Sequence, residues 1–226
     1  HLNRELRFYG NLFFDRGATY MAGLPNDSTA LYKQHFYAME YSGKRGATDY
    51  SITGYLPKKL IGYRSSLTSS GWSPYRYAFP VIRLADLYLM YAEALNESLS
   101  TPSAEVYKYI DMVRERAGLQ GVINAWQNHS KYPAKPTTKD GMREIIRRER
   151  LNELACEGKR FWDLRRWKIT LPKEIYGWNT AGKTPDNFYR KTVVYERPEY
   201  YYRDYLWPLK ISTLLQNPNL IQNPGW

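Results

Sequence analysis

Residues 146–167 carry a dense row of arginines and glutamates that runs through a glycine into an aromatic segment. Glu149, Glu153 and Glu157 are spaced four residues apart, so a helix over about 138–157 places them on one face. Charged groups at this spacing interact along a helix and can reach neighbouring helices. The row therefore constrains the fold more than any other part of the chain.

Acidic side chains in this row are surrounded by guanidinium groups, and Asp163 follows just beyond the row. Such carboxylates have a lowered pKa and make poor general acids. We therefore predict that they join helices through ion pairs, rather than forming the carboxylate pair of a glycoside hydrolase. The predicted structural network consists of Arg83, Glu93, Glu149, Arg150, Glu153, Glu157, Arg160 and Asp163.

A glycine at position 158 predicts the end of the charged helix, and a short helix is expected at about 160–168. The helical register of Trp162 and Trp167 predicts that both are core residues. The single cysteine, Cys156, excludes an intramolecular disulfide. Its position on the charged helix favours a small buried packing residue over a reactive nucleophile.

Two further helices are predicted before the charged row. The first covers residues 80–97 with a broad apolar surface, and Pro80 is expected in its first turn. The second begins with Thr101 as N-cap and Pro102 in the first turn, and it ends at Gly118. Together they form a helical hairpin that resembles a tetratricopeptide unit, although the chain shows no second copy at a fixed period.

Shorter elements are expected elsewhere. Apolar residues alternate with polar ones over 6–12, which predicts a short strand, and residues 191–196 predict another. Residues 120–137 are expected to be a loop. Thr137 or Thr138 then caps the charged helix.

The net charge of the chain is +11, which raises the question of nucleic-acid binding. The basic excess is spread over the whole chain, and most central basic residues have acidic neighbours at helical spacing, so we predict no nucleic-acid partner. No apolar run reaches the roughly 20 residues that span a bilayer. The chain begins at His1 without a methionine, so we expect it to be the C-terminal part of a longer protein.

The sequence gives no support for a catalytic or metal centre. The three histidines, His1, His35 and His129, do not share a helix at metal-ligand spacing. No serine stands in a Gly-x-Ser-x-Gly elbow, and no glycine-rich phosphate loop is present. We therefore predict no catalytic residue, no metal site, no cofactor and no enzymatic activity.

Four segments occur together in one order. They are RLADLYLMYAEA at 83–94, IDMVRERAGL at 110–119, ERLNELACEGKRFWDLRRW at 149–167, and LWPL at 206–209 with NPNLIQNPGW at 217–226. Together they resemble the C-terminal part of the SusD/RagB family of outer-membrane nutrient-binding lipoproteins. The likeness is strong over residues 80–226 and loose over 1–79.

The resemblance implies a mainly α, tetratricopeptide-related fold, an α-α superhelix with long irregular loops and a few short strands. It divides the chain into a loop-rich, ligand-facing segment at 1–79 and a helical region at 80–226. It further implies a lipid-anchored protein on the cell surface that captures glycans for nutrient uptake. The implied partner is a SusC-like, TonB-dependent outer-membrane transporter, and the lipid anchor would lie in an N-terminal part that this chain does not contain.

Loop aromatics are the candidate ligand-binding residues, because a sugar ring packs its C–H face on an aromatic ring while its hydroxyls bond to polar neighbours. The chain has 22 tyrosines and 7 tryptophans. The opposing interpretation is that these side chains anchor a long loop to the protein body. The candidates are Trp72, Tyr75, Arg76, Tyr77, Tyr41 and Tyr50. Tyr37 lies in the same loop region as the last two, and Trp126 and Trp178 are weaker candidates.

Four functional alternatives remain open at this stage. A RagB-type protein would take up peptides instead of glycans. A helical scaffold that binds only protein would bury Trp72. A glycan-cleaving enzyme would need a free carboxylate pair, and a nucleic-acid binder would bind with a steep salt dependence.

Overall fold

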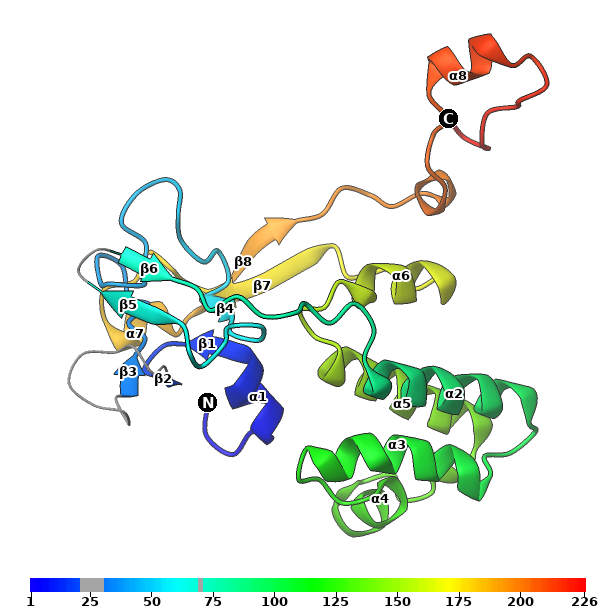
Figure 1. Cartoon of the computed structure of the whole chain (residues 1–226), viewed down its shortest axis with the longest axis horizontal. Helices are drawn as coiled ribbons and strands as arrows, with labels where there is room; N and C mark the ends of the chain where they lie inside the picture. The colour runs from blue at the N-terminus through cyan, green and yellow to red at the C-terminus, as the bar shows by residue number, and fades with distance from the viewer. Residues whose placement is uncertain (21–30, 69–70) are drawn as a thin grey trace.

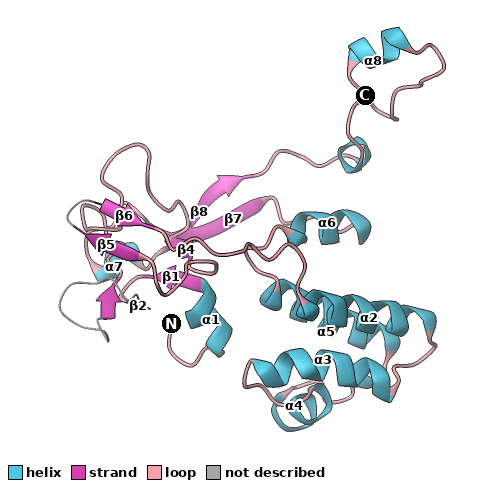
Figure 2. Ribbon diagram, in the orientation of Figure 1, coloured by secondary structure: helices cyan, strands magenta, loops and turns pink. Residues whose placement is uncertain are grey.

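The computed structural model describes residues 1–20, 31–68 and 71–226. Helices dominate it, and the strands that it describes are short and paired two by two (Figure 2). A helical body formed by residues 84–166 lies beside a body of loops and strands, and a C-terminal arm extends away from both (Figure 1). The mainly α fold class predicted from the sequence is confirmed.

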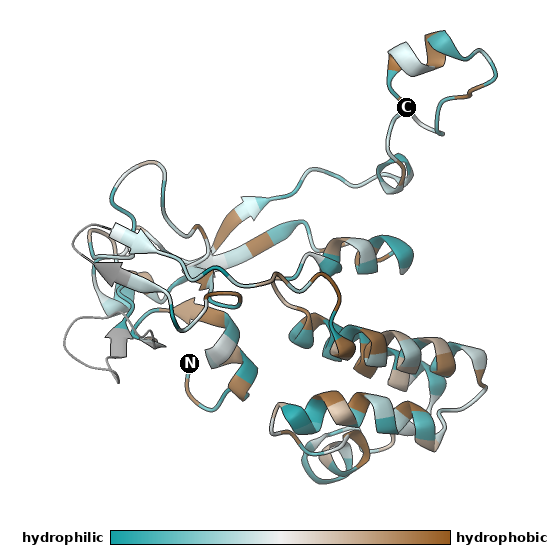
Figure 3. Cartoon of the chain, viewed as in Figure 1, coloured by the Kyte–Doolittle hydropathy of each residue, from teal (hydrophilic) through white to brown (hydrophobic). Residues whose placement is uncertain are grey.

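The helical body consists of α2 (Leu84–Ser98), α3 (Ala104–Arg116), α4 (Val122–His129), the 3-10 helix η1 (Lys135–Thr137), α5 (Lys139–Glu153) and α6 (Lys159–Arg166). Helices α2 and α3 form the expected hairpin, and α5 packs along α2. Apolar faces of these helices meet in one core, visible as brown segments that face one another (Figure 3). Its fully buried members include Leu89, Val106, Ile110, Val113, Met142 and Ile146.

Helix starts differ from the sequence prediction in two places. Helix α2 begins at Leu84, and Pro80 precedes it by four residues, because Arg83 is still extended (φ −119°). Helix α3 begins at Ala104 after an extended Ser103, so the predicted cap at Thr101 is wrong. Both prolines lie in the extended connections, which their fixed φ also suits. Gly118 terminates α3 as predicted: the helix ends at Arg116, and Gly118 just beyond it is in the left-handed conformation (φ +73°).

The segment predicted as a loop at 120–137 contains α4 and η1, so that prediction is wrong. A tertiary contact explains the difference: Asp111 of α3 accepts a hydrogen bond from the main-chain N–H of Val122 at 2.7 Å. This carboxylate satisfies a free N–H group at the start of α4. The predicted cap of α5 is correct, since Thr138 Oγ1 accepts from the N–H of Gly141 at 3.1 Å.

The loop and strand body contains four two-stranded antiparallel sheets in the described residues. They pair β1 (Leu12–Phe14) with β4 (Tyr55–Pro57), β2 (Ala18–Tyr20) with β3 (Leu31–Lys33), β5 (Ser66–Thr68) with β6 (Gly71–Ser73), and β7 (Glu174–Trp178) with β8 (Lys191–Glu196). The strand predicted at 191–196 is therefore confirmed. A small aromatic core holds this body together. It is formed by Phe36, Tyr37 and Phe188, and Phe188 is the last residue of the short helix α7 (Pro185–Phe188).

The segment predicted as a strand at 6–12 is mostly the helix α1 (Leu6–Asn11), and the strand β1 follows it. The alternation of apolar residues is real, but α1 turns Arg7 toward α5, where two glutamates pair with it. The local sequence pattern favours a strand only weakly, and the long-range ion pairs of Arg7 are formed by the helical conformation instead.

The C-terminal arm contains the 3-10 helix η2 (Tyr202–Tyr205) and α8 (Ile211–Gln216). Gln222 bonds to both main-chain groups of Leu209, and Trp226 Nε1 donates to the carbonyl of Arg203 at 3.0 Å. The last residues of the chain, which contain the Asn-Pro steps, therefore fold back onto residues 203–209 of the same arm. Its η2 part contacts the helical body, because Arg165 of α6 donates to the carbonyl of Asp204, and α8 extends away from that body (Figure 1).

Candidate functional site

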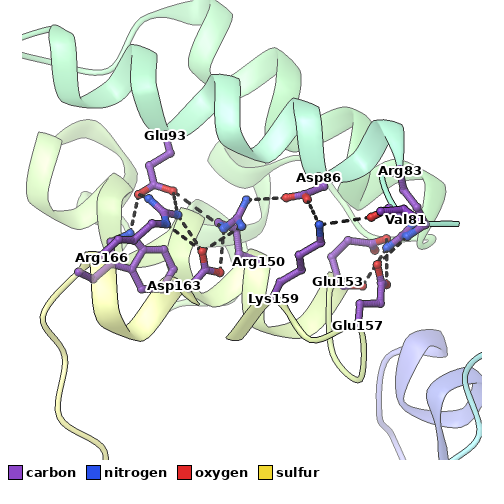
Figure 4. Close-up of polar contacts among 11 residues, drawn as sticks. Val81, Arg83, Asp86, Glu93, Arg150, Glu153, Glu157, Lys159, Asp163 and Arg166 are labelled. Atoms are coloured by element: carbon purple, nitrogen blue, oxygen red, sulfur yellow. Dashed lines mark hydrogen bonds and ion pairs between the residues drawn. The ribbon is translucent and has the colours of Figure 1, made fainter. Parts of the chain in front are cut away.

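Arg150 is the centre of a buried ion-pair network between α2, α5 and α6 (Figure 4). Its guanidinium donates to Asp163 of α6 through two nitrogens, each at 3.0 Å, and to Asp86 of α2 at 3.0 Å. Only 4% of the Arg150 side chain is exposed. Arg150 therefore joins three helices through one planar group, which suits the bidentate geometry of arginine.

Glu93 extends the same network along α2. Its carboxylate accepts hydrogen bonds from Arg166 at 2.6 and 2.7 Å, and from Trp167 Nε1 at 2.6 Å. At the other end, Lys159 reaches Asp86 at 3.1 Å. Each carboxylate in this part of the network thus has at least one cationic partner.

Glu153 is the second centre, and its side chain is only 2% exposed. It pairs with Arg83 at 2.9 Å, with Arg116 of α3 at 2.6 Å and with Arg7 at 3.1 Å. Glu149, one turn earlier, pairs with Arg7 at 2.7 Å and with Arg114 at 3.0 Å. The carboxylates of α5 therefore contact the helical hairpin and the N-terminal segment together.

Glu157 lies in the turn after α5, which ends at Glu153. It pairs with Arg83 at 2.7 Å and with Lys59 of the loop body. Among the described residues of segment 1–79, Arg7 and Lys59 attach it to α5, and Lys59 also donates to the carbonyl of Glu153 at 2.6 Å. Sequence reasoning missed these two and also Asp86, Arg114, Arg116, Lys159 and Arg166. Most of these contacts join residues far apart in the chain, whereas Arg166 is three residues from its partner Asp163 and could have been found from that spacing.

Three predictions around the turn are corrected by the structure. Cys156 is exposed, because it lies in the turn between α5 and α6 and not on the helix, and its backbone there is left-handed (φ +65°). Trp162 is 62% exposed, since α6 presents it on its outer face. Arg160 forms no ion pair with any described carboxylate and instead lies over Trp167, with 5.9 Å from Cζ to the ring centre.

The candidate ligand-binding aromatics fall into two groups. Tyr41 and Tyr50 line an open hollow in the loop body, which we call the loop hollow; its volume is about 810 Å³. Each ring lies beside a cation, with Arg45 5.8 Å from the Tyr41 ring centre and Lys44 4.6 Å from that of Tyr50. The wall also includes Ser42, Thr48, Asp49 and Ser51. The loop hollow thus combines aromatic faces with hydrogen-bonding groups.

Trp72, Tyr75 and Tyr77 do not line the loop hollow. Trp72 lies on β6 and is 47% exposed, and Arg76 is also exposed. Tyr75 accepts a hydrogen bond from Arg64 at 3.3 Å, and Tyr77 donates to the carbonyl of Leu60 at 2.6 Å. The two tyrosines therefore partly anchor their loop, whereas Trp72 presents an open face. Ser69 and Ser70, whose small size argued for that exposure, lie outside the described residues.

The other aromatic candidates, Tyr37, Trp126 and Trp178, are less exposed than Trp72. Tyr37 is buried in the aromatic core, and Trp178 packs against that core while its Nε1 donates to Tyr55 at 2.9 Å. Within the described residues no group of three or more His, Cys, Asp or Glu side chains could hold a metal ion. The same residues include no helix with the length and apolarity that crossing a bilayer requires.

Comparison with known proteins identifies the family. The sequence profile of the SusD family matches residues 1–226. The chain belongs to the SusD family. A SusD-like protein, P2, from Formosa agariphila is 35% identical over 168 residues, which cover 74% of this chain and 28% of that protein.

Two solved structures support the SusD fold. A SusD-like protein from Bacteroides fragilis superposes with a TM-score of 0.74 at 26% identity, over 100% of this chain and 40% of that protein. A SusD-like carbohydrate binding protein from the same species gives 0.68 at 26% identity, over 97% and 42%. This SusD-family chain therefore spans less than half the length of each of these three relatives.

In this SusD-family chain, Glu157 is expected to contribute a pH-dependent part of the stability. Burial acts to raise the pKa of Glu157, but hydrogen bonds from Arg83 and Lys59 and the charges of both outweigh it and hold the pKa below the ordinary 4.5. A carboxyl whose folded-state pKa is depressed stabilises the fold above its ordinary pKa, and the contribution disappears as the pH falls through the lower value.

We therefore expect Glu157→Gln to be less stable by about 1 kcal/mol at neutral pH, because the pair is partly exposed. The difference from the unaltered chain should shrink as the pH falls from about 5 to about 3. Urea unfolding at a series of pH values measures it. A difference that stays constant over this interval would contradict the assigned role of the carboxylate charge.

Proposed function

We propose that this chain is part of a cell-surface protein that binds glycans without cleaving them. Membership of the SusD family and the composition of the loop hollow support the proposal together. In the loop hollow, a sugar ring would pack its C–H face on Tyr41 or Tyr50, and its hydroxyls would bond to Arg45 or Asp49. Segment 1–79 is the ligand-facing part in this proposal, and the helical region at 80–226 supports it.

The network supports binding rather than hydrolysis. Glycoside hydrolysis needs one carboxyl group that can give up a proton and another that is free to attack or to activate water. Glu149, Glu153 and Glu157 are each held by two or more cationic side chains. The exposed face of Trp72 also speaks against a scaffold that buries it.

The whole protein, in this proposal, is a lipid-anchored outer-membrane protein that hands its glycan to a SusC-like, TonB-dependent transporter for nutrient uptake. Its lipid anchor would lie in a part that the present chain does not contain. One relative is described as a SusD-like carbohydrate binding protein, which agrees with a glycan ligand. Uptake of peptides is the alternative for the same architecture.

Calorimetric titration against a panel of glycans and peptides tests the proposal. Tyr50→Ala and Trp72→Ala should each weaken glycan binding about 3- to 10-fold if the ring contacts the sugar, since an aromatic contact contributes about 0.5–1.5 kcal/mol. Tyr132→Ala is the matched control, because Tyr132 is an exposed tyrosine between α4 and α5.

Each outcome of this titration has a clear meaning. An affinity that Tyr50→Ala and Tyr132→Ala leave equally unchanged would remove the loop hollow from the proposal. Binding of peptides but of no glycan would assign the chain to peptide uptake. New reducing ends released from any glycan would instead identify an enzyme.

A further inference from the structure

A second hollow lies in the helical body, away from the loop hollow, and most of its charged side chains are basic. We call it the arginine hollow. It has a volume of about 620 Å³ and is lined by residues of α4, η1, α5 and α6 and by residues just beyond α6. Its polar and aromatic residues are Trp126, Lys135, Glu144, Arg147, Arg148, Arg160 and Trp167.

The three arginines of this hollow are not neutralised by the protein. Among the residues that the structure describes, no carboxylate lies within ion-pair distance of Arg147, Arg148 or Arg160. One carboxylate does line the hollow, that of Glu144, but it is paired with Lys135. These three guanidinium groups therefore have no ion-pair partner among the described residues.

Other arginines of the same helix show the contrast. Arg143 pairs with Glu97 at 2.5 Å, and Arg150 is enclosed by carboxylates. The helix thus has two kinds of arginine, those matched by acidic side chains and those gathered around an open space. A merely solvated basic surface would spread its arginines outward, whereas these line one concave wall.

Aromatic contacts hold the free guanidinium groups in place. The Cζ atom of Arg147 lies 4.8 Å from the centre of the Trp167 ring, and that of Arg160 lies 5.9 Å from it. Such cation–π contacts fix the planes of the guanidinium groups before any ligand arrives. A preorganised cation loses less conformational freedom when it binds an anion.

Two buried features indicate a missing acceptor. The Nε atom of Arg147 is buried and has no hydrogen-bond partner, which costs free energy unless an acceptor binds there. Burial also lowers the pKa of Arg160, and the charge of Asp163 offsets this only in part. An anion in the hollow would offset these costs through the charge of the two guanidinium groups.

We propose that the arginine hollow binds an oxyanion, either a sulfate or a carboxylate group. Guanidinium groups match both in size and bidentate geometry. The volume exceeds what a lone inorganic anion needs, so a saccharide that carries the group also fits. The proposal is independent of glycan binding in the loop hollow, because no residue is shared between the two walls.

Calorimetric titration with a sulfated disaccharide, its unsulfated form, a uronate disaccharide and sodium sulfate tests the proposal at constant ionic strength. We expect an anionic disaccharide to bind at least about tenfold more tightly than the neutral one, because each charge-assisted hydrogen bond is strong. Competition by sodium sulfate at a similar concentration would identify a free anion as sufficient. Much tighter binding of the sulfated disaccharide than of sodium sulfate would show that the site recognises the anionic group as part of a saccharide.

Variants locate the site. Arg147→Gln should weaken binding of the anionic disaccharide about tenfold, and Arg148→Gln, at a more exposed position, provides a second variant that is less coupled to folding. Arg190→Gln is the control, since Arg190 is an exposed arginine that donates to the carbonyl of Asp186 and does not line the arginine hollow. Circular dichroism melting confirms that each variant is folded.

Equal binding by all three folded variants, or equal affinity for the sulfated and unsulfated disaccharides, would overturn the proposal. Tyr50→Ala should leave the anion affinity within about twofold of the unaltered chain. Failure of glycan binding at the loop hollow can therefore be separated from failure at the arginine hollow.

Discussion

Replacing Arg150 by methionine should destabilise the chain by about 3 kcal/mol, at the lower end of the range for breaking a buried ion pair. The substitution keeps the length of the side chain but removes the cation between Asp86 and Asp163. Both carboxylates would remain buried, with 5% of each side chain exposed. Lys159 and Arg166 still contact them, which keeps the loss from being larger.

Urea unfolding followed by circular dichroism measures this loss, and Arg143→Ala is the matched control. Arg143 is on the same helix and pairs with Glu97 and Asp140, both of which are well exposed. An exposed pair contributes about 0–1 kcal/mol, so the control should lose no more than that. Similar losses in both variants would show that burial of the network has no special role.

The core of the helical body could be predicted from the sequence because helical periodicity is a local signal. The buried side of α5 and the cap at Thr138 follow from residues three or four apart. The start of α4 could not be predicted in this way, since the group that satisfies its first N–H belongs to Asp111, eleven residues earlier. Local spacing does not reveal such a contact.

The same limit applies to the candidate sites. The glutamate row of α5 is visible in the sequence, but its partners Arg7 and Lys59 are more than ninety positions away from it. The arginine hollow forms because Arg147 of α5 and Arg160 of α6 both lie over Trp167, and Arg148 lines the same wall. The turn between the two helices brings these residues together. The prediction that Arg160 belongs to the ion-pair network fails for that reason.

Replacing Glu153 by alanine should also destabilise the chain by about 3 kcal/mol, and it should loosen the N-terminal segment in particular. Glu153 is shared by Arg7, Arg83 and Arg116, so its loss leaves three cations with fewer partners. Arg7 is 9% exposed and would keep only Glu149 and Glu5. The attachment of α1 to α5 would therefore weaken more than the packing between α2 and α3.

Hydrogen exchange followed by mass spectrometry distinguishes this local effect from general destabilisation. Peptides from residues 5–16 should exchange faster in Glu153→Ala, while peptides from the core of α2 and α3 should change less. Glu144→Ala is the control, because Glu144 lies on α5 as well but is exposed and, among the described residues, pairs with Lys135 alone. Equal acceleration in both regions would show general destabilisation of the chain, and it would contradict a particular role of Glu153 in attaching segment 1–79 to α5.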